Sequence, residues 1–411
     1  MARCESVVRK VLALEPLLRG KRNVLILAIC QALALSCGVL AVTAGALVGS
    51  ALSANPALAT LPVALTVVGT LFTTVPASQL MQRIGRRPGF ALGALIGLAS
   101  GLVCAAGIQA QSFALFAAGN LLIGAFQAFV GYFRFAAAES VAESFRSRAI
   151  AWVLAGGVVA ALLGPQLAAW GRDFVPERAF LGSYLLLAAF CAAVIPLALG
   201  LALPRVAPAR SAARGRPLAQ IARQPVFIVA VTGATVGYAV MLLVMTATPL
   251  AMVQHHHEVS DAVRVIQAHV LAMFAPSFFS GALVRRFGAI PMMLAGFALL
   301  AAHVAVAAAG AEFGHFFWAL VLLGAGWNFS FVAGTALLTE AYTDAERGKA
   351  QAANEFILSG CVALASLASG WLLHSFGWRA VALSGLPFLA VAAILALGLH
   401  RRRTRAAAHA P

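Results

Sequence analysis

The stretch Met81–Gly89, with the sequence MQRIGRRPG, lies between two long apolar runs and returns in altered form as Leu283–Gly288, with the sequence LVRRFG. A glycine allows the chain to reverse tightly, and the arginines of such a turn stay in water beside a membrane. Each copy lies between the second and the third apolar run of its half of the chain. The recurrence therefore indicates an internally duplicated membrane protein.

The composition agrees with this interpretation. The 411 residues are 62% hydrophobic and only 10% charged, whereas a soluble domain is roughly half apolar and a quarter charged. The formal net charge of +16 comes from short arginine clusters between apolar runs rather than from one basic domain, which argues against a nucleic-acid partner. The 6 cysteines lie singly, so we expect packing residues rather than disulfides or metal ligands.

Apolar runs long enough to cross a membrane, which takes about 20 residues, predict twelve spans. They fall at about 24–52, 57–81, 89–109, 113–138, 149–170, 179–203, 225–253, 262–284, 289–310, 315–338, 349–373 and 380–399. The first run is too long for a cleaved signal peptide, so we expect it to remain. The sequence thus predicts an all-α membrane protein. Its parts are a terminal segment at 1–22, a bundle at 23–203, a linker at 204–224, a second bundle at 225–399 and a basic tail at 400–411.

The arrangement of the basic residues predicts the orientation of the chain. Most of the 29 Lys and Arg residues fall on the side of the spans that carries both termini. Loops rich in Lys and Arg remain in the cytoplasm, so we expect cytoplasmic termini and a location in the inner membrane.

The two halves are similar beyond the basic turn. Three pairs of stretches match at a nearly constant offset: 42–44 with 245–247, 123–127 with 323–327, and 143–145 with 340–342. Each half has an even number of spans, so the copies point the same way. We therefore expect two six-helix bundles related by a pseudo-twofold axis along the membrane normal.

These features resemble the major facilitator superfamily over essentially the whole chain. The family signature after the second span is an acid and an arginine followed by Gly-Arg-Arg. Here Gln82 stands in the place of the acid, which would weaken the contact it makes in the family. The resemblance implies that two bundles rock around a central site, with these turns and two nearby acids as the conformational gate. The implied gate residues are Gln82, Arg83, Gly85, Arg86, Arg87, Glu143, Arg285, Arg286, Gly288 and Glu340.

The resemblance also implies that spans 1, 4, 7 and 10 line the central cavity. Their polar and aromatic residues are Gln31, Gln127, Tyr238, Thr246, Thr248, Trp327 and Asn328. This set has hydrogen-bonding groups and stacking faces with little charge, which suits a neutral or amphipathic organic molecule, such as a heteroaromatic one. The alternative for each residue is a hydrogen bond between helices.

Placing an ionisable group inside a membrane span costs free energy, so such groups are candidates for proton coupling. Glu355 is the acid within a span, and its alternative role is an ion pair with Arg83. Arg134 can equally reach the membrane surface or pair with Glu139. His269 suits a proton carrier, but a lone buried histidine is more often a hydrogen-bonded packing residue.

A secondary transporter of a small organic solute, coupled to protons, is the function these patterns favour. Thr246–Met252, 267–279 and Gly326–Ser330 are similar to bacterial permeases that include riboflavin transporters. Two exporter motifs are half present, which leaves a drug or metabolite antiporter as the alternative. A membrane enzyme would need clustered carboxylates, and ATP coupling would need a Walker-type loop. We expect no cofactor or metal, and a monomer whose partners are the solute, protons and the bilayer.

Overall fold

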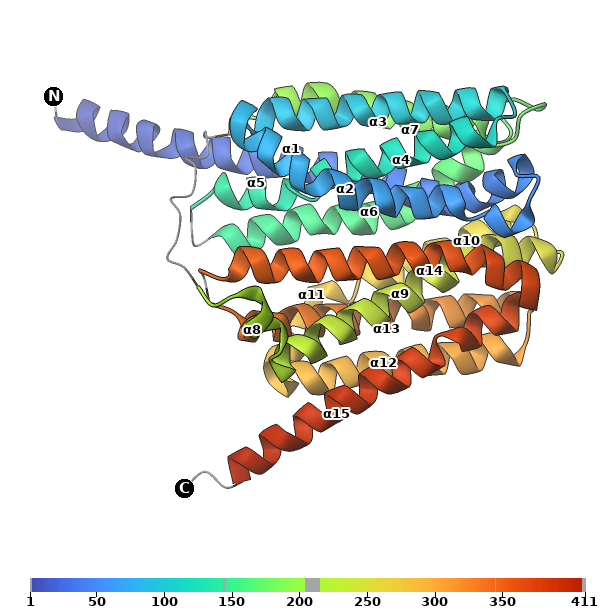
Figure 1. Cartoon of the computed structure of the whole chain (residues 1–411). Helices are drawn as coiled ribbons and strands as arrows, with labels where there is room; N and C mark the ends of the chain where they lie inside the picture. The colour runs from blue at the N-terminus through green and yellow to red at the C-terminus, as the bar shows by residue number, and fades with distance from the viewer. Residues whose placement is uncertain (1, 143–144, 204–214, 344, 409–411) are drawn as a thin grey trace.

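The computed structural model describes residues 2–142, 145–203, 215–343 and 345–408, which form helices joined by short turns. The helices form two bundles that lie side by side (Figure 1). The first contains α1 (Ala2–Leu52), the 3₁₀ turn η1 (Pro56–Leu58), α2 (Leu61–Ile84), α3 (Arg86–Gln109), α4 (Phe113–Val130), α5 (Phe133–Glu139), α6 (Arg146–Arg172) and α7 (Leu181–Leu199). The second contains α8 (Leu218–Ala222), α9 (Pro225–Gln254), α10 (Val259–Phe274), α11 (Ser277–Phe287), α12 (Ala289–Ala309), α13 (Phe313–Leu338), the 3₁₀ turn η3 (Thr339–Ala341), α14 (Arg347–Ser384) and α15 (Leu386–Ala408).

The predicted twelve spans are confirmed. Within the described ranges, 10 stretches are individually long and apolar enough to cross a membrane, and α10 with α11 adds a span bent by 42°. The stretch Arg347–Arg405 provides two crossings, because Gly377 interrupts it with a positive φ of 76°. The bend between α10 and α11 was not predicted, although its cause is visible in the sequence: Pro276 has no amide hydrogen to continue the helical ladder.

The two basic turns have one conformation. Gly85 has φ 94° and ψ 159°, and Gly288 has φ 91° and ψ 157°. The amide of each glycine closes the preceding helix with a 2.9 Å hydrogen bond, to the carbonyls of Met81 and Val284 respectively. An L side chain rarely adopts this φ. The glycine in each copy is therefore required by the reversal of the chain, as a duplicated fold demands.

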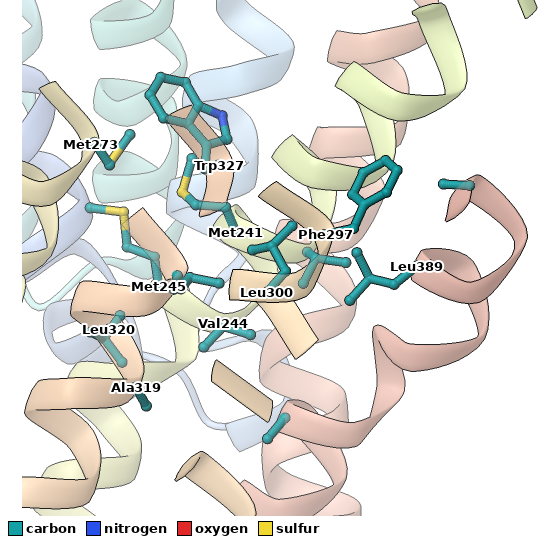
Figure 2. Close-up of a cluster of buried hydrophobic side chains, with 14 of the residues drawn as sticks. Met241, Val244, Met245, Met273, Phe297, Leu300, Ala319, Leu320, Trp327 and Leu389 are labelled. Carbon is teal, nitrogen blue, oxygen red and sulfur yellow. The ribbon is translucent and has the colours of Figure 1, made fainter. Parts of the chain in front are cut away.

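One apolar core lies within the first bundle, and the core of the second bundle also includes four residues of the first, Ala46, Ala59, Val63 and Ala161. Figure 2 shows part of the second core, in which side chains of α9, α12, α13 and α15 meet, Leu300 and Leu389 among them. In the first bundle a Cβ on Gly101 of α3 would lie 2.8 Å from the amide nitrogen of Ala188 in α7. Glycine at that position thus sets how closely the two helices approach.

The two bundles are joined near the end of the molecule that is opposite to the chain termini, which we call the distal end; both termini lie at the other, terminal end (Figure 1). Thr60 at the start of α2 is fully buried. Its hydroxyl accepts the N–H of Gly370 at 3.2 Å and donates to the carbonyl of Leu367 at 3.4 Å, both in α14. In addition, Gln267 of α10 donates to the carbonyl of Leu162 in α6 at 3.1 Å.

The terminal half of the interface is different. Between any two described residues, no hydrogen bond or ion pair joins the bundles there. The short helix α5 packs on α1 and α6 of its own bundle, and α11 packs on α10, α12 and α13 of its own. Among the described residues, the hydrogen bonds that join the bundles therefore lie away from the terminal end.

The end of the linker is fixed to the start of α14, which was not predicted. Glu346 is only 2% exposed, and its carboxylate accepts hydrogen bonds from the Arg216 backbone N–H, Nε and Nη2 at 2.7 to 2.8 Å and from the Thr343 N–H at 3.0 Å. Arg216 is the main reason that the pKa of Glu346 lies well below its usual range. Lys349 donates to the carbonyl of Gly215 at 3.1 Å, and a Cβ on that glycine would lie 2.4 Å from Glu346 Cγ. We call this contact the linker clamp. Residues 204–214 of the predicted linker lie outside the described residues.

Candidate functional site

An aromatic cluster lies near the middle of α9 and α13. Trp327 and Phe331 are four residues apart on α13, on one helix face, and their rings are stacked at 12° with centroids 5.2 Å apart. Tyr238 of α9 meets both rings edge-on, at 5.4 and 5.6 Å. Tyr238 and Phe331 are partly exposed. We call these three residues the aromatic cluster; it can stack against a flat conjugated ligand.

The cluster reaches the interface between the bundles. The ring of Phe274 in α10 lies 6.3 Å from that of Trp327. On its other side, Phe274 fills the place beside Gly157 of α6, where a Cβ would lie 2.8 Å from the Phe274 ring. A ligand bound at the cluster would therefore lie where the two bundles meet.

Glu355 of α14 is next to the aromatic cluster. Its side chain is exposed, and Asn354 Nδ2 lies 3.3 Å from Glu355 Oε1 in a weak hydrogen bond. One turn further along the helix, Leu358 packs in a small core with Tyr238 and Phe331. The charge of Glu355 acts on Tyr238. The second bundle thus presents a carboxylate beside three aromatic rings.

Arg134 contributes the opposite charge from the first bundle. It lies in α5, is exposed, and its guanidinium lies 4.9 Å from the centroid of the Phe135 ring. Its charge acts on Glu355, yet no described residue forms an ion pair with either side chain. The ion pairs considered from the sequence, Glu355 with Arg83 and Arg134 with Glu139, are therefore absent from the described part of the chain.

The gate residues of the first copy make a different contact. Arg86 Nη2 forms an ion pair with Glu139 Oε1 at 2.6 Å, which links the start of α3 to the end of α5. Gln82, Arg83 and Arg87 are exposed. Gln82 and Arg83 make no side-chain hydrogen bond or ion pair to another residue that the structure describes. Glu143, the acid expected beside this turn, lies outside the described residues.

In the second copy Glu340 does not pair with the arginines of the turn. Arg285 and Arg286 are exposed, and the guanidinium of Arg286 lies 5.2 Å from the ring of Phe287. Glu340 instead pairs with Arg403 of α15, at 2.7 Å. The glycine turns are alike in the two halves, whereas the ion pairs around them are not.

Three of the candidate substrate residues use polar atoms in hydrogen bonds within the protein. Gln127 Nε2 donates to the carbonyl of Ala34 at 2.9 Å and so joins α4 to α1. Asn328 Nδ2 lies 2.8 Å from the Met273 carbonyl and 2.6 Å from the Ser277 hydroxyl, on either side of the bend between α10 and α11. Thr248 is fully buried and donates to the carbonyl of Val244 in its own helix, at 2.8 Å. Their polar atoms are largely used within the protein.

Gln31, Thr246 and Trp327 are buried and keep unused polar atoms. Gln31 Oε1, Thr246 Oγ1 and Trp327 Nε1 have no hydrogen-bond partner among the described residues. They lie in α1, α9 and α13, which are three of the expected lining helices. Asn328 Oδ1 likewise has no partner among the described residues, so these three residues, Tyr238 and the carbonyl oxygen of Asn328 keep groups free for a ligand.

His269 is fully buried, and its Nδ1 lies 2.7 Å from the carbonyl of Leu320 in α13. His303 of α12, which the sequence interpretation left out, makes the same contact with the neighbouring carbonyl of Ala319 at 2.9 Å. The two imidazoles thus attach α10 and α12 to α13. This geometry favours the packing role for His269 over the role of a proton carrier.

No group of three His, Cys, Asp or Glu side chains that could hold a metal ion occurs in the part of the chain that the structure describes. In the run His255–His257, His257 Nε2 lies 2.8 Å from the carbonyl of Ala311. The site therefore consists of aromatic rings and two opposite charges, which can bind and orient a solute between two bundles.

Known proteins resemble the chain over most of its length. The sequence model of the Major Facilitator Superfamily matches residues 24–305 and 265–411. The riboflavin transporter RfnT of Brucella anthropi is 45% identical over 391 residues, which cover 95% of this chain and 98% of that protein. The uncharacterized MFS-type transporter YdeG of Bacillus subtilis is 30% identical over 385 residues, 89% of each chain.

A solved structure shares the fold. The inward-facing, unoccupied structure of a bacterial homolog to the human lysosomal transporter Spinster has a TM-score of 0.69 and 16% sequence identity, covering 92% of this chain and 96% of that one. An identity this low concerns the fold alone. The family model and the relatives carry the assignment: the chain belongs to the Major Facilitator Superfamily, and it is a membrane transporter rather than an enzyme.

Proposed function

We propose that the protein is a secondary transporter that carries riboflavin, or a flavin with the same ring system, into the cell. The observation that carries this proposal is the aromatic cluster of Tyr238, Trp327 and Phe331 at the bundle interface. A flat tricyclic ring without net charge gains most of its binding energy from stacking on such faces. The 45% identity to a protein named a riboflavin transporter supports this choice of ring system.

The orientation of the molecule in the membrane and its location follow from the charges. The terminal end carries exposed arginines at both glycine turns and at the end of α15, so we place it in the cytoplasm and the protein in the inner membrane. The site lies between two bundles of one chain, so the monomer is the transporting unit. Bundles that are joined by hydrogen bonds at the distal end would then admit solute from the cytoplasmic side, and the opposite state would require breaking the contact at Thr60.

Proton coupling is assigned to Glu355. It is an acid within a span, it lies beside the aromatic cluster, and no described basic residue pairs with it. A coupling carboxylate must take up and release a proton as the bundles move. Glu355→Gln should therefore remove the pH dependence of concentrative riboflavin uptake, whereas counterflow exchange, which needs no net proton movement, should still occur at saturating riboflavin. Parallel loss of both modes would reject the coupling role and favour a structural one.

Riboflavin counterflow in proteoliposomes tests the proposal. The wild-type protein should accumulate labelled riboflavin against an internal pool of unlabelled riboflavin, and Trp327→Ala should weaken this exchange by about tenfold, the scale of one lost ring stack. Trp318→Ala is the matched control, because Trp318 is on the same helix but is 60% exposed and lies outside the cluster. Absence of riboflavin exchange by a correctly folded wild-type protein would contradict the proposal.

Export of drugs or metabolites is the competing function. Cells that cannot synthesise riboflavin separate the two directions: an importer restores growth on low external riboflavin, whereas an exporter impairs it further.

A further inference from the structure

We propose that Glu355 and Arg134, which come from opposite bundles, recognise the imide edge of the transported ring. In this arrangement the Glu355 carboxylate accepts the imide N–H, and the Arg134 guanidinium donates to a neighbouring ring carbonyl. The inference rests on the proposed function and deepens it, because it names the functional group by which the protein selects its substrate. It restricts the substrate class to fused rings that carry a pyrimidinedione.

The position of the two side chains supports this assignment. Glu355 precedes Leu358 by one helical turn, about 5 Å along the axis, and Leu358 packs beside Tyr238 and Phe331. A ring stacked on the aromatic cluster would therefore have one edge next to Glu355. Arg134 is in α5 of the other bundle, and its charge acts on this carboxylate.

Both groups have unused hydrogen-bonding capacity. Arg134 makes no hydrogen bond to an acceptor in the described ranges, and its charge rests against the Phe135 ring. Glu355 receives a single long hydrogen bond, from its neighbour Asn354. Ionised groups within a membrane protein normally have partners, and charge-assisted hydrogen bonds are the strong ones. A ligand that offers an acceptor to one and a donor to the other would satisfy both.

The chemistry of the flavin ring matches this pair. Its pyrimidinedione carries an N–H between two carbonyl oxygens, so one short edge is acceptor, donor, acceptor. A carboxylate alone would be repelled by the two oxygens, and a guanidinium alone would be opposed by the N–H. One acceptor and one donor placed side by side complement the edge, and a ring without the imide would leave both charges unpaired.

A comparison of two ligands across variants tests the inference. Binding to the full-length protein is measured by quenching of flavin fluorescence, with riboflavin and with its analogue methylated at the imide nitrogen. In the wild type, methylation should weaken binding about tenfold or more, because it removes a hydrogen bond to a charged group. In Glu355→Leu this ratio should fall to near one, and in Glu355→Gln, which keeps an acceptor oxygen, it should take an intermediate value.

Arg134→Met should weaken riboflavin and the methylated analogue by the same factor, leaving the ratio as in the wild type. The same variant should lose the preference for riboflavin over an analogue with sulfur in place of the ring carbonyl oxygens.

Glu312→Leu is the matched control, since Glu312 is an exposed acid before α13 at the distal end, and it should keep the wild-type ratio. Melting temperatures exclude variants that fail to fold, and Glu355→Gln keeps the test decisive if Glu355→Leu is among them.

A ratio that remains at the wild-type value in both Glu355 variants would overturn this inference while leaving riboflavin binding intact. That result would assign the two charges to closing the terminal end instead. A wild-type protein that binds neither flavin would overturn the proposed function itself, and the recognition of the imide with it.

Discussion

The hydroxyl of Thr60 should set the balance between the two conformations of the transporter. It is fully buried at the distal end, where it bonds to the amide of Gly370 and the carbonyl of Leu367 in the other bundle. Thr60→Val keeps the branched shape of the side chain and removes the hydroxyl. The state joined at the distal end loses both bonds, whereas a state that opens there has none to lose.

The magnitude follows from the geometry. The two distances, 3.2 and 3.4 Å, are at the long end for hydrogen bonds. A typical net contribution is about 0.5 to 1.5 kcal/mol, so two long bonds together contribute about 1 kcal/mol. This amounts to a roughly fivefold shift in the population ratio towards the state that is open at the distal end.

Spin labels on Ala54→Cys and Gln254→Cys, exposed positions at the distal ends of the two bundles, measure this shift as an increased fraction of long distances. Cys361, which is exposed, is replaced by serine. Thr335→Val is the matched control, because that exposed hydroxyl bonds only to a carbonyl of its own helix. An unchanged distance distribution in Thr60→Val, or an equal change in the control, would refute the reasoning.

Three further variants test other contacts. The pKa of Glu346 is depressed in the folded protein, so its ionised form stabilises the fold above the unfolded pKa near 4.5, and this stabilisation is lost as the pH falls through the folded pKa. Arg216→Ala should therefore lower the melting temperature at pH 7, and this deficit should shrink in acid. A constant deficit would refute the role of that ion pair. Asn328→Leu should cost about 1 to 3 kcal/mol of unfolding free energy, since buried partners lose their donor; a wild-type unfolding curve would argue against it. Gly101→Val should reduce the yield of folded protein, because its Cβ would lie 2.8 Å from Ala188 N, whereas Gly398→Ala, with open space around it, should not; equal yields would count against the contact.

The sequence sufficed to predict the twelve spans and their duplication. Length and hydropathy determine which segments cross a membrane. Lipid offers no hydrogen bonds to the backbone, and an α-helix satisfies its backbone N–H and C=O groups within one segment. The recurring glycine predicted the reversals at Gly85 and Gly288, since few other residues adopt that backbone conformation. These signals are local, so a single sequence contains them without any comparison to other sequences.

The pairing of charged side chains could not be predicted in the same way. Arg83 and Glu139 were the partners considered for Glu355 and Arg134, yet neither pair forms: Glu139 pairs with Arg86, and the charge that acts on Glu355 is that of Arg134. Which faces meet depends on helix tilt and rotation, which packing against neighbours determines. Asn328 shows the same limit, because an amide in a lining helix looks alike in sequence whether it binds a ligand or a neighbouring helix.

The linker clamp changes what the connection between the bundles does mechanically. Without it, residues 204–224 would pull on the first turn of α9. With Gly215 and Arg216 fixed to Glu346, the tether ends at α14 and comprises residues 204–214, which reach at most about 40 Å when fully extended. Tension that develops as the terminal ends separate is therefore applied to α14, the helix that also carries Glu355 and Gly370. The length of the tether then limits how far the bundles can separate at the terminal end.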